Sequence, residues 1–164
     1  MKKILLLSDT HGYLDEEILH YAKEADEVWH AGDIGNIAVT DKLKEFAKVR
    51  GVFGNIDGTE IRLEFPEWNI FEVEGVKVAM KHIGGYPGRY AKGVRERLKE
   101  IKPDLFISGH SHILKVMPDK KMNLIHMNPG AAGKSGFHKK RTMLMFDVDK
   151  DELKNLRVIE WDRK

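Results

Sequence analysis

Five short apolar segments recur along the chain, and each of them leads into polar residues that can bind a metal ion. The segments lie at residues 4–7, 28–29, 52–53, 76–80 and 105–107. The polar residues that follow them are, in chain order, Asp9 with His11, Asp33, Asn55, His82, and His110 with His112. Because the loops after the carboxyl ends of strands converge in open α/β sheets, we expect these side chains to form one site of nitrogen and oxygen donors.

The spacing of apolar residues predicts an α/β first half and a mostly β second half. In the first half we expect strands at 3–8, 27–31 and 49–53, helices at about 15–24, 39–48 and 88–101, and an extended stretch at 62–80 that turns at Glu74 and Gly75. In the second half we expect strands at 104–108, 113–117, 122–127, 141–148 and 155–161. No repeat or linker marks a boundary, so we expect a single domain, 1–164, with two packed sheets and helices on the outer faces.

Composition excludes several classes of protein. The chain has no cysteine, so disulfide frameworks, thiolate zinc sites, iron–sulfur clusters and a cysteine nucleophile are ruled out. Its 28 lysines and arginines nearly balance its 26 aspartates and glutamates, which gives no chain-wide attraction to nucleic acid or to membranes. No uninterrupted apolar run exceeds four residues, whereas a membrane span needs about twenty. We therefore expect a cytoplasmic protein.

Each polar residue at these strand ends also has an ordinary interpretation. Asp9 and His11 can be a helix cap beside a solvated histidine, Asp33 and Asn55 follow glycines and can belong to turns, and His82 can be a core histidine. The two histidines at 110–112, which follow a glycine at which the backbone can bend, are harder to explain unless a second site or a turn is involved. That all of these ordinary interpretations hold at once, in this order along the chain, is less favoured than a single site built from many metal-binding donors.

With these motifs, Asp9-x-His11, Gly32-Asp33, Gly54-Asn55, His82 and Gly109-His110-x-His112, the chain resembles the calcineurin-like metallophosphoesterases. It is most similar to their small single-domain phosphodiesterase branch. The resemblance implies a four-layer α/β/β/α sandwich of two mixed sheets, and hydrolysis of phosphodiester bonds by a hydroxide that bridges two metal ions. It also implies that one ion takes Asp9, His11, Asp33 and His112, and that the other takes Asp33, Asn55, His82 and His110.

The donor types suit transition metals and a singly charged substrate. Mixed imidazole and carboxylate ligands favour Mn, Ni, Zn, Fe or Co over Mg or Ca, and we expect two divalent ions with manganese first. The carboxylates of Asp9 and Asp33 and a bridging hydroxide neutralise three of the four metal charges, which leaves about one for a small-molecule phosphodiester anion.

One position departs from the family pattern. Many members carry a histidine directly after the Gly-Asn pair, where Ile56 stands here and cannot donate a proton. Without a general acid, roughly 10²–10⁴-fold of rate is missing for poor leaving groups, so we expect good leaving groups to be favoured. The catalytic candidates to replace the acid are His138 and Asp57, and His138 and Arg141 are candidate substrate contacts. The alternative for residues 136–141 is a solvated, charged entry to a strand.

Other segments carry weaker expectations. Residues 128–135 nearly spell a P-loop, but Asn128 stands at its first glycine and no helix follows, so we interpret the segment as a glycine-rich loop beside the metals. Residues 83–90 can form a substrate rim or lead into a helix. The remaining histidines, His20, His30 and His126, are interpreted as structural. The aromatic residues that could give a homo-oligomer an apolar contact surface are Trp68, Phe71, Tyr86 and Tyr90.

Two other functions compete with phosphodiester hydrolysis. A non-catalytic scaffold that resembles the retromer subunit would share the fold and bind partner proteins, but that scaffold has lost part of the ligand set that is intact here. A nuclease would need room for a DNA-capping domain, and the basic residues of this chain are dispersed, so nucleic acid is not an expected partner.

Overall fold

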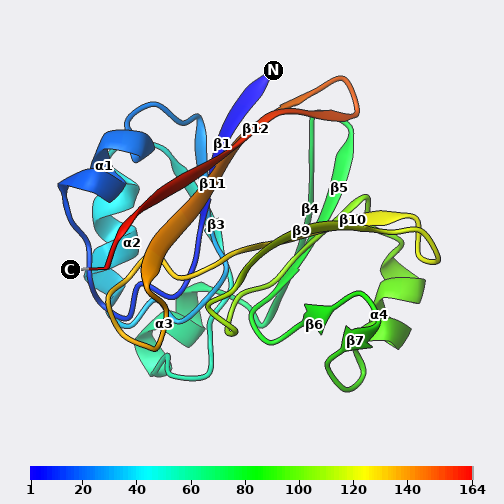
Figure 1. Ribbon diagram of the computed structural model, residues 1–164, viewed down its shortest axis with the longest axis horizontal. Helices are drawn as coiled ribbons and strands as arrows, with labels where there is room; N and C mark the ends of the chain where they lie inside the picture. Colours follow the sequence, from blue (N-terminus) through cyan, green and yellow to red (C-terminus); the bar gives the residue numbers. More distant parts are fainter. Residues whose placement is uncertain (164) are drawn as a thin grey trace.

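Two five-stranded sheets pack face to face in the computed structural model, which describes residues 1–163 (Figure 1). The first sheet has the order β12-β11-β1-β2-β3, with β1 (Lys2–Leu7), β2 (Glu27–His30), β3 (Lys48–Gly51), β11 (Lys140–Asp149) and β12 (Glu152–Asp162). The second has the order β4-β5-β8-β10-β9, with β4 (Trp68–Val73), β5 (Val76–Lys81), β8 (Leu105–Ile107), β9 (Leu114–Asp119) and β10 (Leu124–Pro129).

Strand β1 contributes side chains to two hydrophobic cores, one on each face of the first sheet. Ile4 and Leu6 point into the core between the two sheets, where they join Trp29. Leu5 and Leu7 belong to a second core, between the first sheet and its helices. Because side chains alternate along a strand, a segment that is apolar at every position must be covered on both faces.

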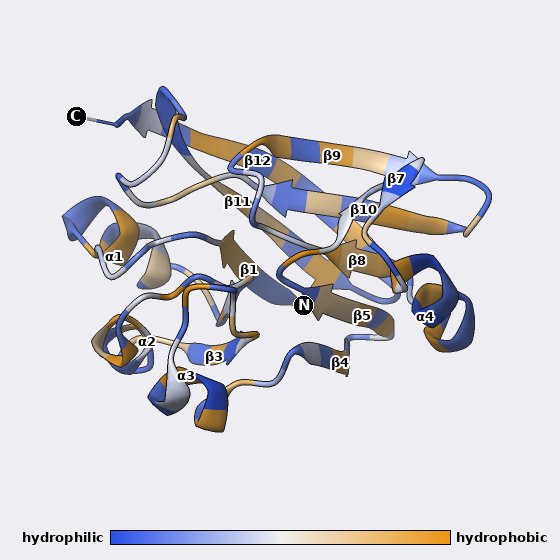
Figure 2. Ribbon diagram, turned by 90° about the horizontal axis from the view of Figure 1, so that it is seen from below, coloured by the Kyte–Doolittle hydropathy of each residue, from blue (hydrophilic) through white to orange (hydrophobic). Residues whose placement is uncertain are grey.

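Helices form the two outer layers of the molecule. α1 (Glu16–Ala22), α2 (Ile37–Leu43) and α3 (Thr59–Glu64) pack on the first sheet, and α4 (Val94–Ile101) packs on the second. Figure 2 shows the same layers from another direction, with apolar residues in both the strands and the helices. The predicted four-layer α/β/β/α sandwich is therefore confirmed. None of the described helices is long and apolar enough to cross a membrane.

Two expected elements begin six residues later than predicted, the helix at Val94 and the extended stretch at Trp68. The helix expected from residue 88 starts at Val94, and the residues before it form a hairpin of β6 (Gly85–Tyr86) and β7 (Arg89–Tyr90). Gly88 and Gly93 have φ values of 90° and 81°, a left-handed conformation that an α-helix cannot contain. The expectation that residues 62–64 are extended is also wrong, because they end α3, whose single buried residue left too weak a helical pattern to detect.

Three of the four aromatic residues expected on a contact surface are committed to packing or hydrogen bonding. Phe71 meets Trp29 edge-on with ring centroids 5.0 Å apart, and Trp68 stacks on Phe106 at 6.1 Å. The hydroxyl of Tyr90 donates to Asp119 at 2.6 Å. Tyr86 is 37% exposed.

The topology brings one edge of each sheet together. β1, β2 and β3 are parallel, and so are β5, β8 and β10, so each group ends on one side of its sheet. Backbone hydrogen bonds then join the loops that follow, from Asp9 N–H to the Gly32 carbonyl at 2.9 Å and from Gly109 N–H to the His82 carbonyl at 3.0 Å. The Asp9 carboxylate links the two sheets by accepting from the His110 N–H at 3.1 Å.

Candidate metal centre

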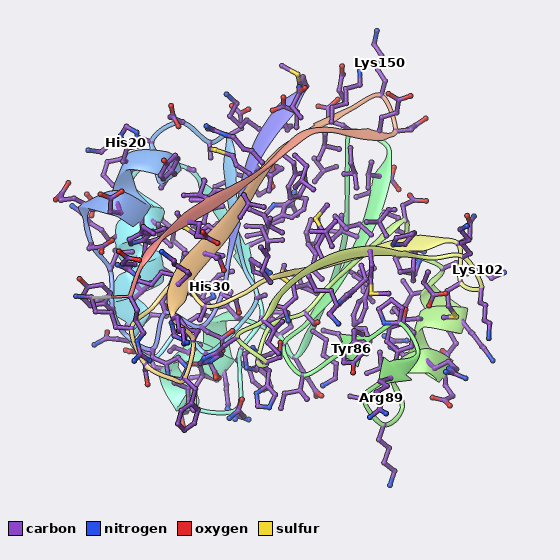
Figure 3. All side chains as sticks on the ribbon, in the orientation of Figure 1. His20, His30, Tyr86, Arg89, Lys102 and Lys150 are labelled. Atoms are coloured by element: carbon purple, nitrogen blue, oxygen red, sulfur yellow. The ribbon has the colours of Figure 1, made fainter. Side chains whose placement is uncertain are left out.

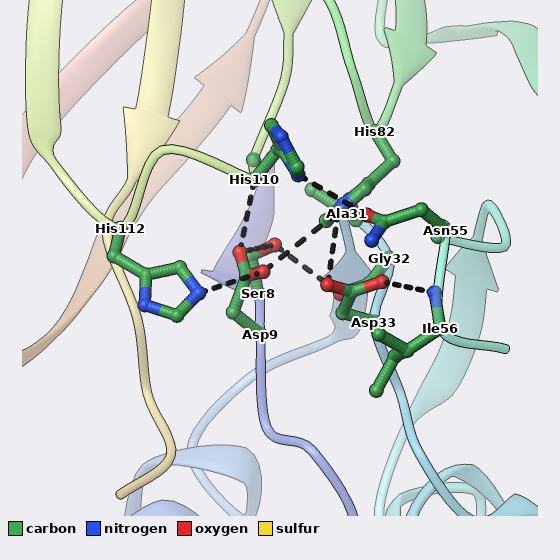
Figure 4. Close-up of polar contacts among 12 residues, drawn as sticks. Ser8, Asp9, Ala31, Gly32, Asp33, Asn55, Ile56, His82, His110 and His112 are labelled. Carbon is green, nitrogen blue, oxygen red and sulfur yellow. Dashed lines mark hydrogen bonds and ion pairs between the residues drawn. The ribbon is translucent and has the colours of Figure 1, made fainter. Parts of the chain in front are cut away.

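All seven predicted ligands lie together where β1, β2, β3, β5 and β8 end, and Figure 4 labels all of them except His11. Six of them form two groups in which the donor atoms lie within 4.8 Å of one another: Asp9, His11 and His112, and Asp33, His82 and His110. The amide oxygen of Asn55 lies 3.1 Å from the Nδ1 atom of His110, beside the second group. Each group contains three of the four ligands that the resemblance implied for one of the two ions.

Asp33 stands between the two groups. Its Oδ2 atom lies 3.4 Å from His11 Nε2 in the first group and 3.2 Å from His82 Nε2 in the second. Its Oδ1 atom accepts a hydrogen bond from the Ile56 N–H at 3.1 Å, which fixes the direction of the carboxylate. A single carboxylate therefore faces donors from both groups.

The backbone is strained at most of these residues. Left-handed φ values between 47° and 72° occur at Asp9, His11, Asp33, His110 and His112. This conformation costs a non-glycine residue on the order of 1–3 kcal/mol and persists only when the surrounding structure imposes it. The loops thus hold the donors in place at the expense of folding free energy, as functional sites commonly do.

Glycines beside the ligands are required by close approach. A Cβ atom on Gly32 would lie 2.5 Å from His82 Nδ1, and one on Gly54 would overlap the carboxylate of Asp33. From the sequence alone, these glycines could be ordinary turn residues. In the structure, the absence of a side chain lets the ligand loops approach each other closely.

Unpaired buried atoms test whether these residues fit a cation. His82 Nδ1 lies 2.7 Å from the Ala31 carbonyl, which can only accept, so Nδ1 carries the hydrogen and Nε2 of the neutral ring is a bare lone pair. That lone pair faces the Asp33 carboxylate. Among the described residues, Asp9 Oδ1, His11 Nε2 and His82 Nε2 are buried without a hydrogen-bond partner. Converging lone pairs repel one another unless positive charge lies between them, so the donor set fits divalent metal ions.

The electrostatics of the site also favour cations. Burial acts to raise the pKa of Asp9, but the imidazoles of His11 and His112, whose Nε2 atoms lie 3.8 and 3.2 Å from Oδ1, outweigh it and the pKa is lowered. The nearby Asp9 carboxylate in turn raises the pKa of His11. Burial acts to lower the pKa of His82, but Asp33 and Asp9 raise it above the ordinary value. Protons on the imidazoles supply the positive charge that metal ions would replace, so metal affinity should weaken as the pH falls.

Asp57 supports the loops that carry two of the ligands. It is buried and accepts hydrogen bonds from the N–H groups of Gly54 at 2.8 Å, Gly35 at 2.8 Å and Ile34 at 3.1 Å. Both of its oxygens therefore accept hydrogen bonds within the loops that hold Asp33 and Asn55. The structure does not place Asp57 among the metal ligands as a proton donor.

Replacing Asp57 with asparagine should lower metal affinity by about 10- to 100-fold, because an amide NH₂ would face backbone donors and displace the loops. Isothermal titration of the metal-free protein with Mn²⁺ measures this. Asp41→Asn, on the exposed side of α2, is the matched control and should bind as the wild type does. Unchanged affinity in Asp57→Asn would contradict the supporting role.

Asn128 supports the loop that carries His110 and His112, a role that the sequence did not reveal. Its amide donates to the Gly109 carbonyl at 3.0 Å and to the Ser111 hydroxyl at 3.2 Å. The glycine-rich loop after it lies against the ligand loop of β1, since the Gly133 N–H donates to the Asp9 carbonyl at 3.2 Å.

The two candidate substrate contacts lie in different places. His138 meets the ring of His112 edge-on at 5.2 Å and donates from Nε2 to the Gly133 carbonyl at 2.8 Å, and its Nδ1 has no partner among the described residues. Arg141 is 2% exposed and pairs with Asp15, the N-cap of α1, at 2.7 Å. The structure brings His138 to the ligands and commits Arg141 to a buried ion pair.

Comparisons with known proteins identify relatives of the chain. Residues 1–151 match the model of the calcineurin-like phosphoesterase superfamily domain. A protein of Methanocaldococcus jannaschii named as a probable metallophosphoesterase is 30% identical over 164 aligned residues, which cover 94% of this chain and 81% of the relative.

Solved structures show the same fold at lower identity. Vps29 from Entamoeba histolytica superposes with a TM-score of 0.77 at 16% identity and covers 98% of both chains. A protein described as a novel archaeal phosphodiesterase superposes with a TM-score of 0.74 at 20% identity, covering 97% of this chain and 99% of its own.

Proposed function

Because this chain belongs to the calcineurin-like phosphoesterase superfamily, we propose that it hydrolyses phosphodiester bonds with two divalent metal ions held by Asp9, His11, Asp33, Asn55, His82, His110 and His112. The observation that carries the proposal is the position of Asp33, whose carboxylate faces histidines of both donor groups. The phosphodiesterase of the same fold supports the choice of a diester.

Divalent ions bound in this site would supply an activated water and electrophilic centres for the phosphoryl oxygens. The chain's own contribution is to hold the donors rigidly and to keep most of them neutral. Four imidazoles and one amide add no negative charge, so the site remains attractive to an anion. Ile56, which follows Asn55 and is 47% exposed, cannot protonate a departing alkoxide. We therefore expect esters with good leaving groups to react fastest.

Turnover of two chromogenic esters tests the proposal. The protein is stripped with a chelator, reloaded with Mn²⁺, Ni²⁺ or Zn²⁺, and assayed with bis(p-nitrophenyl) phosphate and with p-nitrophenyl phosphate. Activity that needs added metal and favours the diester is the expected result. The proposal fails when no metal restores hydrolysis of either ester and metal analysis finds fewer than one bound ion per chain.

A non-catalytic protein scaffold is the second candidate function. Its support is that Ile56, Ile83, Ile113 and Phe137, all adjacent in sequence to ligands or to His138, are 47%, 38%, 62% and 103% exposed. Exposed apolar side chains around a polar centre are typical of an interaction surface. The complete set of donor residues favours catalysis, and the turnover assay separates the two candidates.

His138→Ala should lower kcat/KM about tenfold on a diester with a poor leaving group, since Nδ1 lies beside the ligand His112, has no partner among the described residues and can donate a proton to the departing oxygen when the ring is protonated. The loss should be smaller on bis(p-nitrophenyl) phosphate, whose leaving group needs no acid. Phe137→Ala, at the fully exposed neighbouring position, is the matched control. An unchanged kcat/KM on the poor leaving group would rule out this contact.

A further inference from the structure

A pocket of about 280 Å³ opens beside the metal centre, between the outer face of the second sheet and the β6–β7 hairpin. The candidate ligand His110 forms part of its wall, so the pocket is continuous with the site where a phosphate would lie. Tyr86, labelled in Figure 3, lines the pocket from the hairpin. Ile83, Ile113, Lys115 and His126 also line it. A substrate bound at the metals could extend into this pocket.

His126, one of the residues that line the pocket, carries a buried hydrogen-bond acceptor. The side chain is fully buried, and its Nδ1 lies 3.1 Å from the Phe106 carbonyl, so Nδ1 carries the hydrogen. Burial lowers the pKa of His126 to about 4, which keeps the ring neutral and Nε2 unprotonated near pH 7. Nε2 has no partner among the described residues, and a buried acceptor costs folding free energy unless a donor reaches it.

Apolar and aromatic side chains form much of the remaining wall, which Arg89, Ser111 and Asn128 also line. Tyr86, Ile83 and Ile113 are 37%, 38% and 62% exposed, so they border an accessible opening. The ammonium group of Lys115 lies 3.8 Å from the centre of the Tyr86 ring, which holds the ring in place and disfavours a cationic ligand. A flat, neutral ring that carries an N–H donor matches this combination of groups, whereas a simple alkyl or phenyl group would leave His126 unpaired.

We propose that this pocket binds the nucleobase of a nucleotide phosphodiester, with His126 Nε2 accepting a hydrogen bond from an amino group of the base and Tyr86 packing against its ring. The proposal rests on the proposed function, because it places the phosphate of the same molecule at the metal ligands. His126 and Tyr86 then determine specificity, and they act on a part of the substrate that is remote from the bond that is cleaved.

Nucleoside binding tests the pocket without any hydrolysis. Protein loaded with diamagnetic Zn²⁺ is titrated with adenosine and with purine riboside, which lacks the amino group, while the ring nitrogens of His126 are followed by NMR. Adenosine should shift the Nε2 resonance and bind about tenfold more tightly than purine riboside, the value of one hydrogen bond. Equal affinities, or no shift at His126 with adenosine, would overturn the proposal.

His126→Leu removes the acceptor, and its affinities for the two nucleosides should become equal. Because residue 126 is buried, the exposed variant Tyr86→Ala is tested in parallel, and adenosine binding should weaken roughly tenfold through loss of stacking. Ile70→Ala, on β4 and 39% exposed, is the matched control and should bind adenosine as the wild type does. Unchanged binding in Tyr86→Ala counts against the proposal whether or not His126→Leu folds.

A kinetic comparison connects the pocket with the reaction. The p-nitrophenyl esters of adenosine 5′-phosphate and of methyl phosphate share a leaving group, and the wild type should show a kcat/KM at least tenfold higher for the adenosine ester. Tyr86→Ala should lower that ratio about tenfold, and Ile70→Ala should keep it. Equal kcat/KM for both esters in the wild type overturns the nucleobase proposal but does not contradict the proposed phosphodiesterase activity. Hydrolysis of neither ester refutes the proposed function, and the nucleoside titration then decides the pocket.

Discussion

Asp33→Asn is expected to lower kcat/KM on bis(p-nitrophenyl) phosphate by about 10³-fold or more, because a metal centre supplies several kcal/mol of transition-state stabilisation. The lost negative charge is the one that faces both donor groups, at 3.4 Å from His11 and 3.2 Å from His82. Asparagine keeps the shape of the side chain and can still accept the Ile56 N–H through Oδ1, so the fold should survive. Steady-state kinetics together with metal analysis measure the effect.

The matched control for this substitution is again Asp41→Asn, which removes one carboxylate from the exposed side of α2. It should retain wild-type turnover and metal content. If Asp33→Asn bound two ions per chain and stayed within tenfold of wild-type turnover, Asp33 would have no bridging role and the proposed division of ligands would have to be revised.

The positions of the ligand residues were predictable because one topological rule places them. Asp9, Asp33 and Asn55 follow the parallel strands β1, β2 and β3, and the sequence pattern alone marks where each strand ends. The same holds for His82 and His110 after β5 and β8. The rule led us to expect one shared site, but the way in which the two sheets dock was not predictable, since no local pattern tells one sheet where the other will lie.

The contacts that were not predictable join residues that are far apart in the chain. Arg141 looked like a substrate contact because it follows a run of basic residues, but Asp15, 126 positions earlier, pairs with it. Asp57 was a candidate proton donor from the sequence, but its carboxylate accepts hydrogen bonds from three backbone N–H groups. The free nitrogen of His126 depends on the carbonyl of Phe106 in a neighbouring strand, and no spacing in the sequence reports that pairing.

His30, one of the three histidines interpreted as structural, shows how the ligand loops depend on a neutral ring. Thr10 Oγ1 donates to the Ile34 carbonyl at 2.9 Å, so at 3.0 Å it must accept from His30 Nε2–H. His30 Nδ1 accepts from the Gly32 N–H at 3.2 Å. A second proton would turn Nδ1 into a donor that faces this N–H. The same hydrogen bonds that order the loops after β1 and β2 therefore exclude an imidazolium.

The protein is expected to lose stability sharply as the pH falls from about 6.5 to about 4. Burial lowers the pKa of His30 and of His126 from 6.5 to about 4. In this window the unfolded chain binds protons that the folded chain does not, so the free energy of unfolding decreases with decreasing pH. At about 1.4 kcal/mol per pKa unit, each histidine removes roughly 3 kcal/mol by pH 4, a large part of the ~5–15 kcal/mol typical of a domain.

Urea denaturation of the metal-free protein at several pH values between 7 and 4 measures this loss. The raised pKa values of His11 and His82 act with the opposite sign, since their stabilisation is present at acid pH and is lost as the pH rises. Comparing variants in the same background removes that contribution. His126→Leu should flatten the pH dependence by roughly 3 kcal/mol across the window, whereas His20→Gln, on the exposed side of α1, should leave it unchanged. If His126→Leu kept the wild-type slope, the ring would already be charged in the folded protein, and it could not serve as the acceptor proposed for the nucleobase.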